Sequence, residues 1–201
     1  MILNTKTLLV CAMIITALAF AINPAKIKPY ELAENWVTSE LIEYSWKKRL
    51  HGDIEARPWP WMKSVPEAKL TIPDFEKEFV IMRGTDGNIL AYTPGWHEGS
   101  DKLGVPGISL VSAYKDRHFE FLRHMKPGQK VNLFLPNGEL LEYEVEGLSI
   151  LHGAEMNLSA EPDESVLLLS THYPFFNWQK GDEVRFVVVA RALTKIKRAT
   201  S

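Results

Sequence analysis

The sequence predicts an all-β domain, a barrel or sandwich, that follows an apolar N-terminal segment and a helix. Three observations lead to this prediction. Short apolar or alternating runs recur from residue 68 onward, turn-forming residues separate them, and the only long helical pattern lies upstream. The 201 residues, 46% of them hydrophobic, can bury one core of ordinary size. We therefore expect one main domain (57–201) behind an anchor (1–24) and a helix with its linker (25–56).

The first 24 residues are typical of an export signal. The run from Leu8 to Ile22 is apolar except for Thr16, follows a short positive segment and ends at Asn23-Pro24. It is shorter than the roughly 20 residues of a typical membrane-spanning helix, and Ala19-Phe20-Ala21 suits signal peptidase. Cleavage and retention both stay open. We expect a retained anchor, with the bulk of the chain outside the cytoplasm.

Residues 25–50 are predicted to form an amphipathic helix. Apolar residues recur at spacings of roughly three to five, with charged residues on the other faces: Leu32, Trp36, Leu41, Ile42 and Trp46. We expect a stalk or packing helix, and a partner-binding helix is the alternative. Gly52-Asp53 ends the pattern. The segment 57–61 is expected to be extended, because each Pro disfavours a helical conformation in the residue before it.

Eight strands are expected in the main domain. Their ranges are 68–72, 78–82, 89–92, 108–113, 130–135, 140–151, 165–171 and 183–193. The segments between them contain Gly, Asn and Pro, which favour turns. Residues 121–147 form the clearest unit, a short helix followed by two strands that Asn137-Gly138 joins into a hairpin.

Charge and cysteine content exclude several functions. The 23 basic and 25 acidic residues are well mixed, so no face that would bind nucleic acid is expected. The only cysteine is Cys11, inside the apolar segment. The main domain therefore has neither a thiol nor an internal disulfide.

Several motifs occur in an order that resembles a known family. These are RPWPWMKSVPEAKLTIP (57–73), GNILAYTPGW (87–96), VPGISLVSAYKDRHFEFL (105–122), the hairpin, STHYPF (170–175) and EVRFVVVARA (183–192). Across nearly its whole length the chain resembles a sortase of the class found in Gram-negative bacteria, the class GN or marine proteobacterial type. The resemblance implies a closed eight-stranded β-barrel with short helices. It also implies a single-pass anchor in the inner membrane, with the barrel on the periplasmic side.

The resemblance also implies where a catalytic site would lie. Sortases cleave a sorting motif through a thioester on Cys, with a His that transfers protons and an Arg that stabilises the oxyanion. At the positions that resemble the family's Cys and His, this chain has His172 and Tyr114. Only Arg185, thirteen residues after His172, matches the family's third residue. Groups that act as a unit fail together, so loss of two of them predicts loss of catalysis.

Three hypotheses about function follow from these replacements. The first is an inactive sortase-like protein that binds a peptide sorting signal or a partner protein. The alternative is an active transpeptidase or peptidase that works by atypical chemistry, with an acyl-imidazole on His172. The third is a structural domain with a closed groove. Arg185 could equally bind a peptide carbonyl or carboxylate, or pair with a neighbouring acidic residue.

No cofactor or metal is expected. One alternative places His97, His118 and His172 around a metal ion, although their spacing resembles no ligand pattern. An acidic loop with Glu155, Glu161, Asp163 and Glu164 is expected to be solvated, and calcium binding is its alternative. Three tryptophans are expected to pack in the core or the entry segment, and a platform for a bound peptide is the alternative: Trp59, Trp61 and Trp96.

Overall fold

The chain divides into two compact units, residues 1–36 and 37–201. The computed structural model describes residues 29–152, 160–161, 163–176 and 184–194. The predicted anchor, 1–24, lies outside these ranges. None of the described helices is both long enough and apolar enough to cross a membrane.

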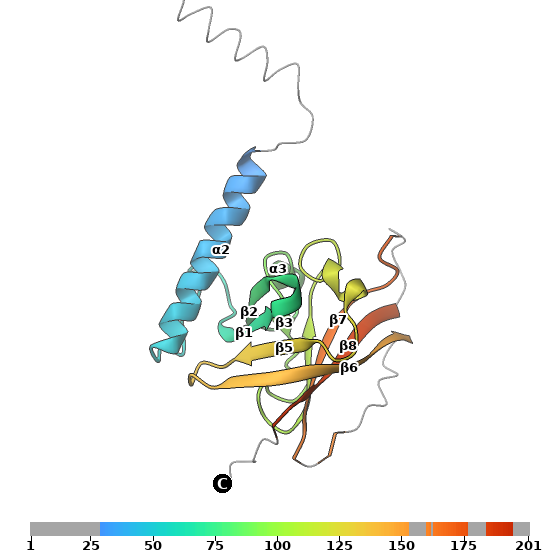
Figure 1. Cartoon of the computed structure of the whole chain (residues 1–201). Coiled ribbons are helices and arrows are strands. Elements are labelled where there is room, and N and C mark those ends of the chain that lie inside the picture. The colour runs from blue at the N-terminus through green and yellow to red at the C-terminus, as the bar shows by residue number, and fades with distance from the viewer. Residues whose placement is uncertain (1–28, 153–159, 162, 177–183, 195–201) are drawn as a thin grey trace, which may run out of the picture. The chain divides into compact units, whose positions relative to one another are not determined.

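The second unit is a closed barrel of eight strands, as predicted (Figure 1). The strands follow the order β1-β2-β3-β4-β7-β8-β6-β5 around the barrel. The pairs β2–β3 and β4–β7 are parallel, and the other pairs are antiparallel. Their bounds are β1 Pro66–Ile72, β2 Lys77–Arg83, β3 Gly95–Trp96, β4 Gly107–Ser112, β5 Lys130–Phe134, β6 Leu140–His152, β7 Ser165–His172 and β8 Val184–Ala192.

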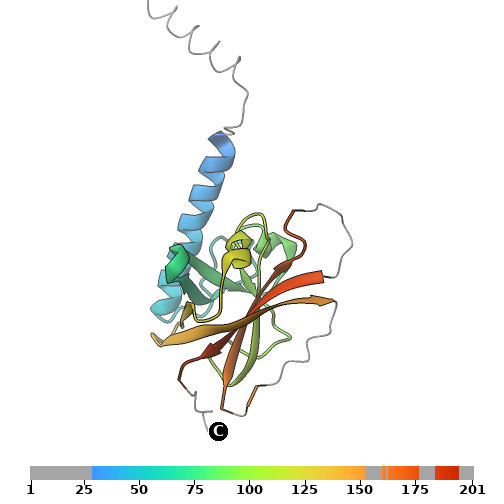
Figure 2. The same ribbon diagram turned by 45° about the vertical axis from the view of Figure 1, so that its right-hand side comes forward.

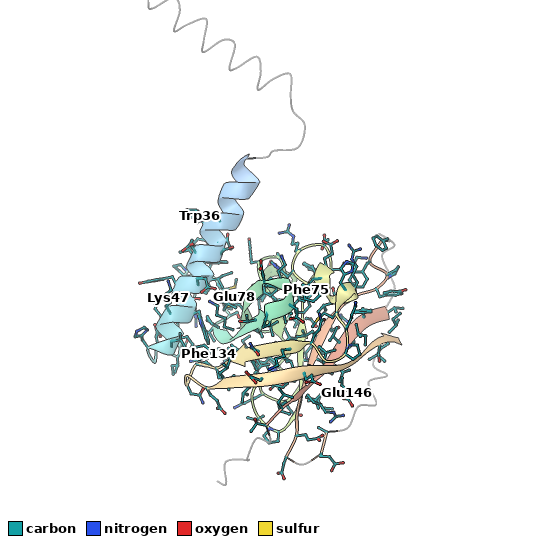
Figure 3. All side chains as sticks on the ribbon, in the orientation of Figure 1. Trp36, Lys47, Phe75, Glu78, Phe134 and Glu146 are labelled. Atoms are coloured by element: carbon teal, nitrogen blue, oxygen red, sulfur yellow. The ribbon has the colours of Figure 1, made fainter. Side chains whose placement is uncertain are left out.

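Four helical segments accompany the strands: α2 Pro29–Leu50, η1 Pro73–Phe75, α3 Gly87–Leu90 and η2 Glu120–His124. From Val37 onward, α2 belongs to the barrel unit. Its Ile42 and Trp46 are buried against Met82 of β2, and the Trp46 ring meets Phe134 of β5 edge-on at 6.2 Å. Figures 2 and 3 show this end of the helix beside the strands. This half of α2 packs against the barrel. Of the two expectations, a stalk or packing helix and a partner-binding helix, the structure agrees with the first.

Strand β7, which lies between β4 and β8 in the barrel wall, is buried on both of its faces. Leu167 and Leu169 point into the barrel core, whereas Val166 and Leu168 belong to a second apolar cluster on the outer face. Side chains alternate along a strand, so residues 166, 168, 170 and 172 share the outer face. This alternation decides where the predicted site residues point.

Three expectations about local structure were wrong. The segment 57–61, expected to be extended, contains a turn in which the Met62 amide donates to the Trp59 carbonyl at 3.1 Å. Residues 89–92, predicted as a strand, lie in α3 and the turn after it, and the third strand is Gly95–Trp96. The amide of Leu90 donates to the Asp86 carbonyl at 2.9 Å, as in a helical turn. A four-residue apolar run has no periodicity that separates strand from helix. Trp61 does not pack as expected, because it is 79% exposed.

Other local expectations were confirmed. Gly138 has a φ of 86° in the β5–β6 turn, a conformation that favours glycine, and η2 is the predicted short helix before that hairpin. Trp96 is buried, and Trp59 packs edge-on against Tyr92 at 5.4 Å.

Candidate functional site

Two of the three predicted site residues lie directly opposite each other on neighbouring strands. His172 is the last residue of β7, and its antiparallel partner on β8 is Arg185. Residues that face each other in this way have Cβ atoms about 4.5–5.5 Å apart and side chains on the same face. The structure therefore brings the imidazole and the guanidinium together, although thirteen residues separate them in sequence.

The pair lies on the outer face formed by β4, β7 and β8. Strand β4 runs parallel to β7, with Ser112 beside Ser170, so both strands end on the same side of the barrel. We call this side the His172 end. Further from this end, the same outer face of β4, β7 and β8 is apolar. It contains the outer cluster: Ile108, Leu110, Val166, Leu168, Val187 and Val189. Val166, Leu168, Val187 and Val189 are buried, whereas Ile108 and Leu110 are only partly buried.

Electrostatics at the site favour a neutral imidazole. Partial burial lowers the pKa of His172 below its ordinary value of 6.5, and the positive charges of Arg185 and Lys115 lower it further. The Lys115 ammonium also donates a hydrogen bond to the Pro174 carbonyl, two residues beyond His172. Two cations and an uncharged imidazole can donate hydrogen bonds to a peptide carbonyl or a carboxylate.

Tyr114, the third predicted residue, lies near this end of β7 through its backbone. The preceding residue, Ala113, donates its amide to the Ser170 carbonyl at 3.2 Å and accepts from the Thr171 hydroxyl at 2.8 Å. The side chain extends toward α3, since a Cβ placed on Gly87 would lie 3.5 Å from the Tyr114 hydroxyl. Among the described residues, no hydrogen bond joins this tyrosine to His172.

Ser170 is a buried neighbour of the candidate site that the sequence interpretation missed. Its side chain is 1% exposed, and its hydroxyl has no hydrogen-bond partner within the described part of the chain. Leaving a buried hydroxyl unpaired costs roughly 1–3 kcal/mol, so a polar ligand group could gain by pairing with it. The sequence did contain a signal for it, because Ser170 precedes His172 by two positions and residues two apart lie on the same face of a strand. The same holds for Lys115, which directly follows Tyr114.

The three histidines considered as metal ligands occupy separate places. His97 follows β3 at the opposite end of the barrel, and its Nδ1 accepts from the Gly99 amide at 3.1 Å. His118 packs edge-on against Phe79 at 5.8 Å. Within the described ranges no three His, Cys, Asp or Glu side chains are grouped as metal ligands.

The acidic loop is only partly described. Glu155 lies outside the described residues. Glu164 accepts hydrogen bonds from Arg191 and from the amide of Glu161. Glu164 therefore has structural partners within the chain.

A large hollow lies at the opposite end of the barrel. Its volume is about 1290 Å³, and its lining includes Arg83, Trp96, Leu135 and Glu139. Glu67 lines it too and pairs there with Arg49 and Arg83. None of the three predicted site residues contributes to this lining.

The sequence matches one family model, and the fold is similar to solved structures. A family model described as the sortase domain matches residues 70–193. No curated protein matches the sequence.

Solved structures with similar folds include three sortases. The chain is similar to a lid mutant of sortase A from Corynebacterium diphtheriae, with a TM-score of 0.58 and 17% identity, covering 79% of this chain and 94% of that one. For the sortase D5 transpeptidase of Clostridium perfringens the TM-score is 0.60 and the identity 15%, over 78% and 96% of the two chains. For sortase C of Clostridium perfringens SM101 these values are 0.55 and 22%, over 90% and 99%. At these identities the likeness shows the fold.

Proposed function

Because the chain belongs to the sortase family, we propose that it is a membrane-anchored, catalytically inactive sortase that binds a peptide sorting signal or a partner protein. Sortases act on peptide sorting signals of protein substrates. The observation that carries the proposal is the absence of a thiol. Cys11 is the only cysteine in the sequence, and the position that resembles the family's nucleophile is His172.

Loss of catalysis follows from the chemistry of the replacements. A sortase needs a thiolate to form its thioester and a proton-transfer group beside it. Tyr114 is a poor substitute for histidine, because a phenol is a far weaker base than imidazole and a far weaker acid than imidazolium. Its side chain also extends toward α3. Neither residue therefore reproduces the role that its position implies.

Retained binding is supported by the groups that remain at the site. Arg185 and Lys115 are cationic neighbours of His172, and the buried Ser170 hydroxyl lies on the same face without a partner in the described residues. A peptide in an extended conformation presents carbonyl oxygens that such donors can bind. The partly buried Ile108 and Leu110 of β4 leave some apolar surface on this face for its side chains.

Class and location are part of the same proposal. The motifs that resemble the class GN sortases support membership of that class. The apolar run from Leu8 to Ile22 supports a single-pass anchor in the inner membrane with the barrel on the periplasmic side. Cell fractionation with a tagged full-length chain tests the location.

The lowered pKa of His172 favours one alternative, an active enzyme with atypical chemistry. In this alternative a neutral imidazole nitrogen attacks the peptide carbonyl carbon and the peptide C–N bond breaks. The proton released from the other ring nitrogen goes to the leaving amine. Water or an acceptor amine then displaces the imidazole, which regains its proton.

Peptide cleavage distinguishes the proposal from this alternative. We would incubate sorting-motif peptides with the wild-type protein and with the double variant His172→Cys, Tyr114→His, and follow cleavage by mass spectrometry. The matched control is His172→Ser, Tyr114→His, which places a hydroxyl where the first variant has a thiol. Peptide binding to the wild type is measured in parallel by fluorescence anisotropy.

We expect the wild type to bind a peptide without cutting it, and the thiol variant to cut measurably faster than its serine control. Cleavage by the wild type would overturn the proposed inactivity. Absence of peptide binding by every variant would overturn the proposed binding role and favour a structural domain.

A further inference from the structure

A second, smaller hollow lies at the His172 end of the barrel. Its volume is about 330 Å³, and β2 and the segment 117–124 form it. Strand β2 is parallel to β3, and β3 is antiparallel to β4. Since β4 ends at the His172 end, β2 begins there. The lining of the hollow includes Lys77, Phe79, Arg117, His118, Phe121 and Arg123. Phe75, labelled in Figure 3, packs against Phe121 with ring centroids 5.3 Å apart.

The rim of this hollow carries an excess of positive charge. Lys77, Arg117 and Arg123 are cationic, and Glu120 is the only carboxylate in the lining. Glu120 is already paired with Arg123, at 2.8 Å. Arg117 donates to the Ala91 carbonyl at 3.0 Å. Lys77 takes part in none of the ion pairs among the residues that the structure describes. Two positive charges are thus not neutralised within the hollow.

The wall of the hollow is aromatic and contains an unpaired nitrogen. The rings of Phe79 and Phe121 are stacked, with centroids 6.2 Å apart. His118 meets Phe79 edge-on, and its Nε2 is buried without a hydrogen-bond partner within the described ranges. Burial, with a smaller contribution from Arg117, lowers the pKa of His118 to about 4. At neutral pH the imidazole is uncharged and can donate one hydrogen bond from Nε2 in the matching tautomer.

We propose that this hollow binds the side chain of a glutamate or aspartate in the peptide that occupies the site beside His172. An acidic side chain has an apolar stem, which fits the phenylalanine rings, and a carboxylate, which fits Lys77, Arg117 and the His118 nitrogen. This inference rests on the proposed peptide-binding function and adds a preference for an acidic residue. An inorganic anion has the same charge but lacks the apolar stem.

The hollow and the His172 site are connected by an aromatic contact. The Arg123 guanidinium lies 4.9 Å from the centre of the Phe176 ring, and Phe176 follows His172 by four residues. Phe176 is 84% exposed, so a bound peptide can pass over it. A chain that leaves the His172 site in this direction reaches the cationic rim.

A test with small probes does not depend on the proposed function. The imidazole resonances of His118 would be recorded in the full-length protein and assigned by their loss in His118→Phe. N-acetyl-glutamate amide is then titrated in, beside N-acetyl-glutamine amide and inorganic phosphate. We expect only the glutamate probe to shift these resonances at millimolar concentration. Equal shifts with the glutamine probe, stronger shifts with phosphate, or no shift at all would overturn the proposed site.

A test with peptides examines the link to the His172 site. Pairs of sorting-motif peptides that differ by one glutamate-to-glutamine change are compared in binding to the wild type, Lys77→Gln and Lys63→Gln. Lys63 is an exposed lysine near the start of β1, at the opposite end of the barrel, and serves as the matched control. We expect Lys77→Gln to weaken glutamate-peptide binding roughly threefold to fivefold, as for an exposed ion pair, and Lys63→Gln to leave it unchanged.

The two failures are distinguishable. If peptides bind but glutamate and glutamine versions bind equally, the acidic preference is overturned and the peptide-binding function stands. If the glutamate probe shifts His118 but no peptide binds, the hollow accepts carboxylates and its role as a peptide subsite is overturned together with the proposed function.

Discussion

His118 and His172 both have a pKa below that of a free histidine, and burial is the first cause in each case. For His118 the second contribution comes from the neighbouring Arg117, and Asp116 opposes it. For His172 the second contribution comes from Arg185, which the strand register places opposite. Both imidazoles are therefore uncharged at neutral pH.

The lowered pKa of His118 predicts a loss of stability in acid. Its pKa is about 4 in the folded protein and about 6.5 when unfolded, so the unfolded state takes up the proton first. This contribution to the free energy of unfolding is complete above pH 6.5 and is lost as the pH falls from 6.5 to 4. Its full size is about 3 kcal/mol. Urea denaturation at a series of pH values measures it.

The control for this prediction is His118→Phe, which keeps an aromatic ring beside Phe79 and removes the titrating group. Between pH 6.5 and 4 the free energy of unfolding should fall less steeply in this variant than in the wild type. If the free energy of unfolding falls equally steeply with pH in both proteins, burial does not lower the pKa of His118.

The sequence identified site residues by position but could not identify their contacts. His172, Tyr114 and Arg185 follow from motifs that can be read along the chain. Lys77 and Arg117 lie forty residues apart and share a hollow only after the barrel closes. Neither residue belongs to a motif that would connect them, so the sequence offered no signal for this hollow.

At the scale of elements, β3 shows how a very short strand is held in place. Gly95 and Trp96 pair with β2 on one side and β4 on the other. A Cβ on Gly95 would come within 2.0 Å of the Gly84 carbonyl oxygen. The backbone at this point therefore leaves no room for a side chain.

This close approach predicts that Gly95→Ala is strongly destabilising. The added methyl group collides with backbone, which cannot move without disturbing the β2–β3 pairing. We expect the free energy of unfolding to fall by about 3 kcal/mol or more, as measured by urea denaturation. Gly147→Ala in β6 is the matched control, since a Cβ there meets no atom within 4 Å and should change stability by less than about 1 kcal/mol. Similar effects of both substitutions would contradict this account.

The segment 89–92 shows why one element was predicted wrongly. Its four residues are compatible with either a strand or a helical turn on local grounds. In the structure, Ile89 and Leu90 are buried, and Ile89 packs with Met82 in the cluster that also holds Trp46 of α2. This packing involves residues that are distant in sequence, so no local pattern contained it.

At the scale of the whole molecule, β7 links the barrel core to the candidate site. Seven of its eight residues are buried, and it has neighbours on both sides, β4 and β8. Only its last residue, His172, is exposed. The site thus lies at the end of the most enclosed strand, which is suited to hold His172 in a fixed position.

This arrangement predicts the pattern of amide hydrogen exchange. Amides from Val166 to Thr171 should exchange most slowly, because opening them requires disruption of both neighbouring strands and of apolar clusters on both faces. Amides in the exposed turn around Asn137 and Gly138 should exchange quickly. The measurement is exchange followed by mass spectrometry or NMR, and comparable rates in the two segments would count against β7 as the most enclosed strand.

The sequence by itself determined the all-β class, most strand positions, the Asn137-Gly138 hairpin and the lack of a thiol in the main domain. These properties depend on neighbouring residues, because alternation, turn preference and composition are local. Only the tertiary structure decided that His172 faces Arg185, that Tyr114 extends toward α3, and that Lys77 shares a hollow with Arg117. Those contacts depend on strand register and barrel closure, which arise from the combined packing of residues distant in sequence.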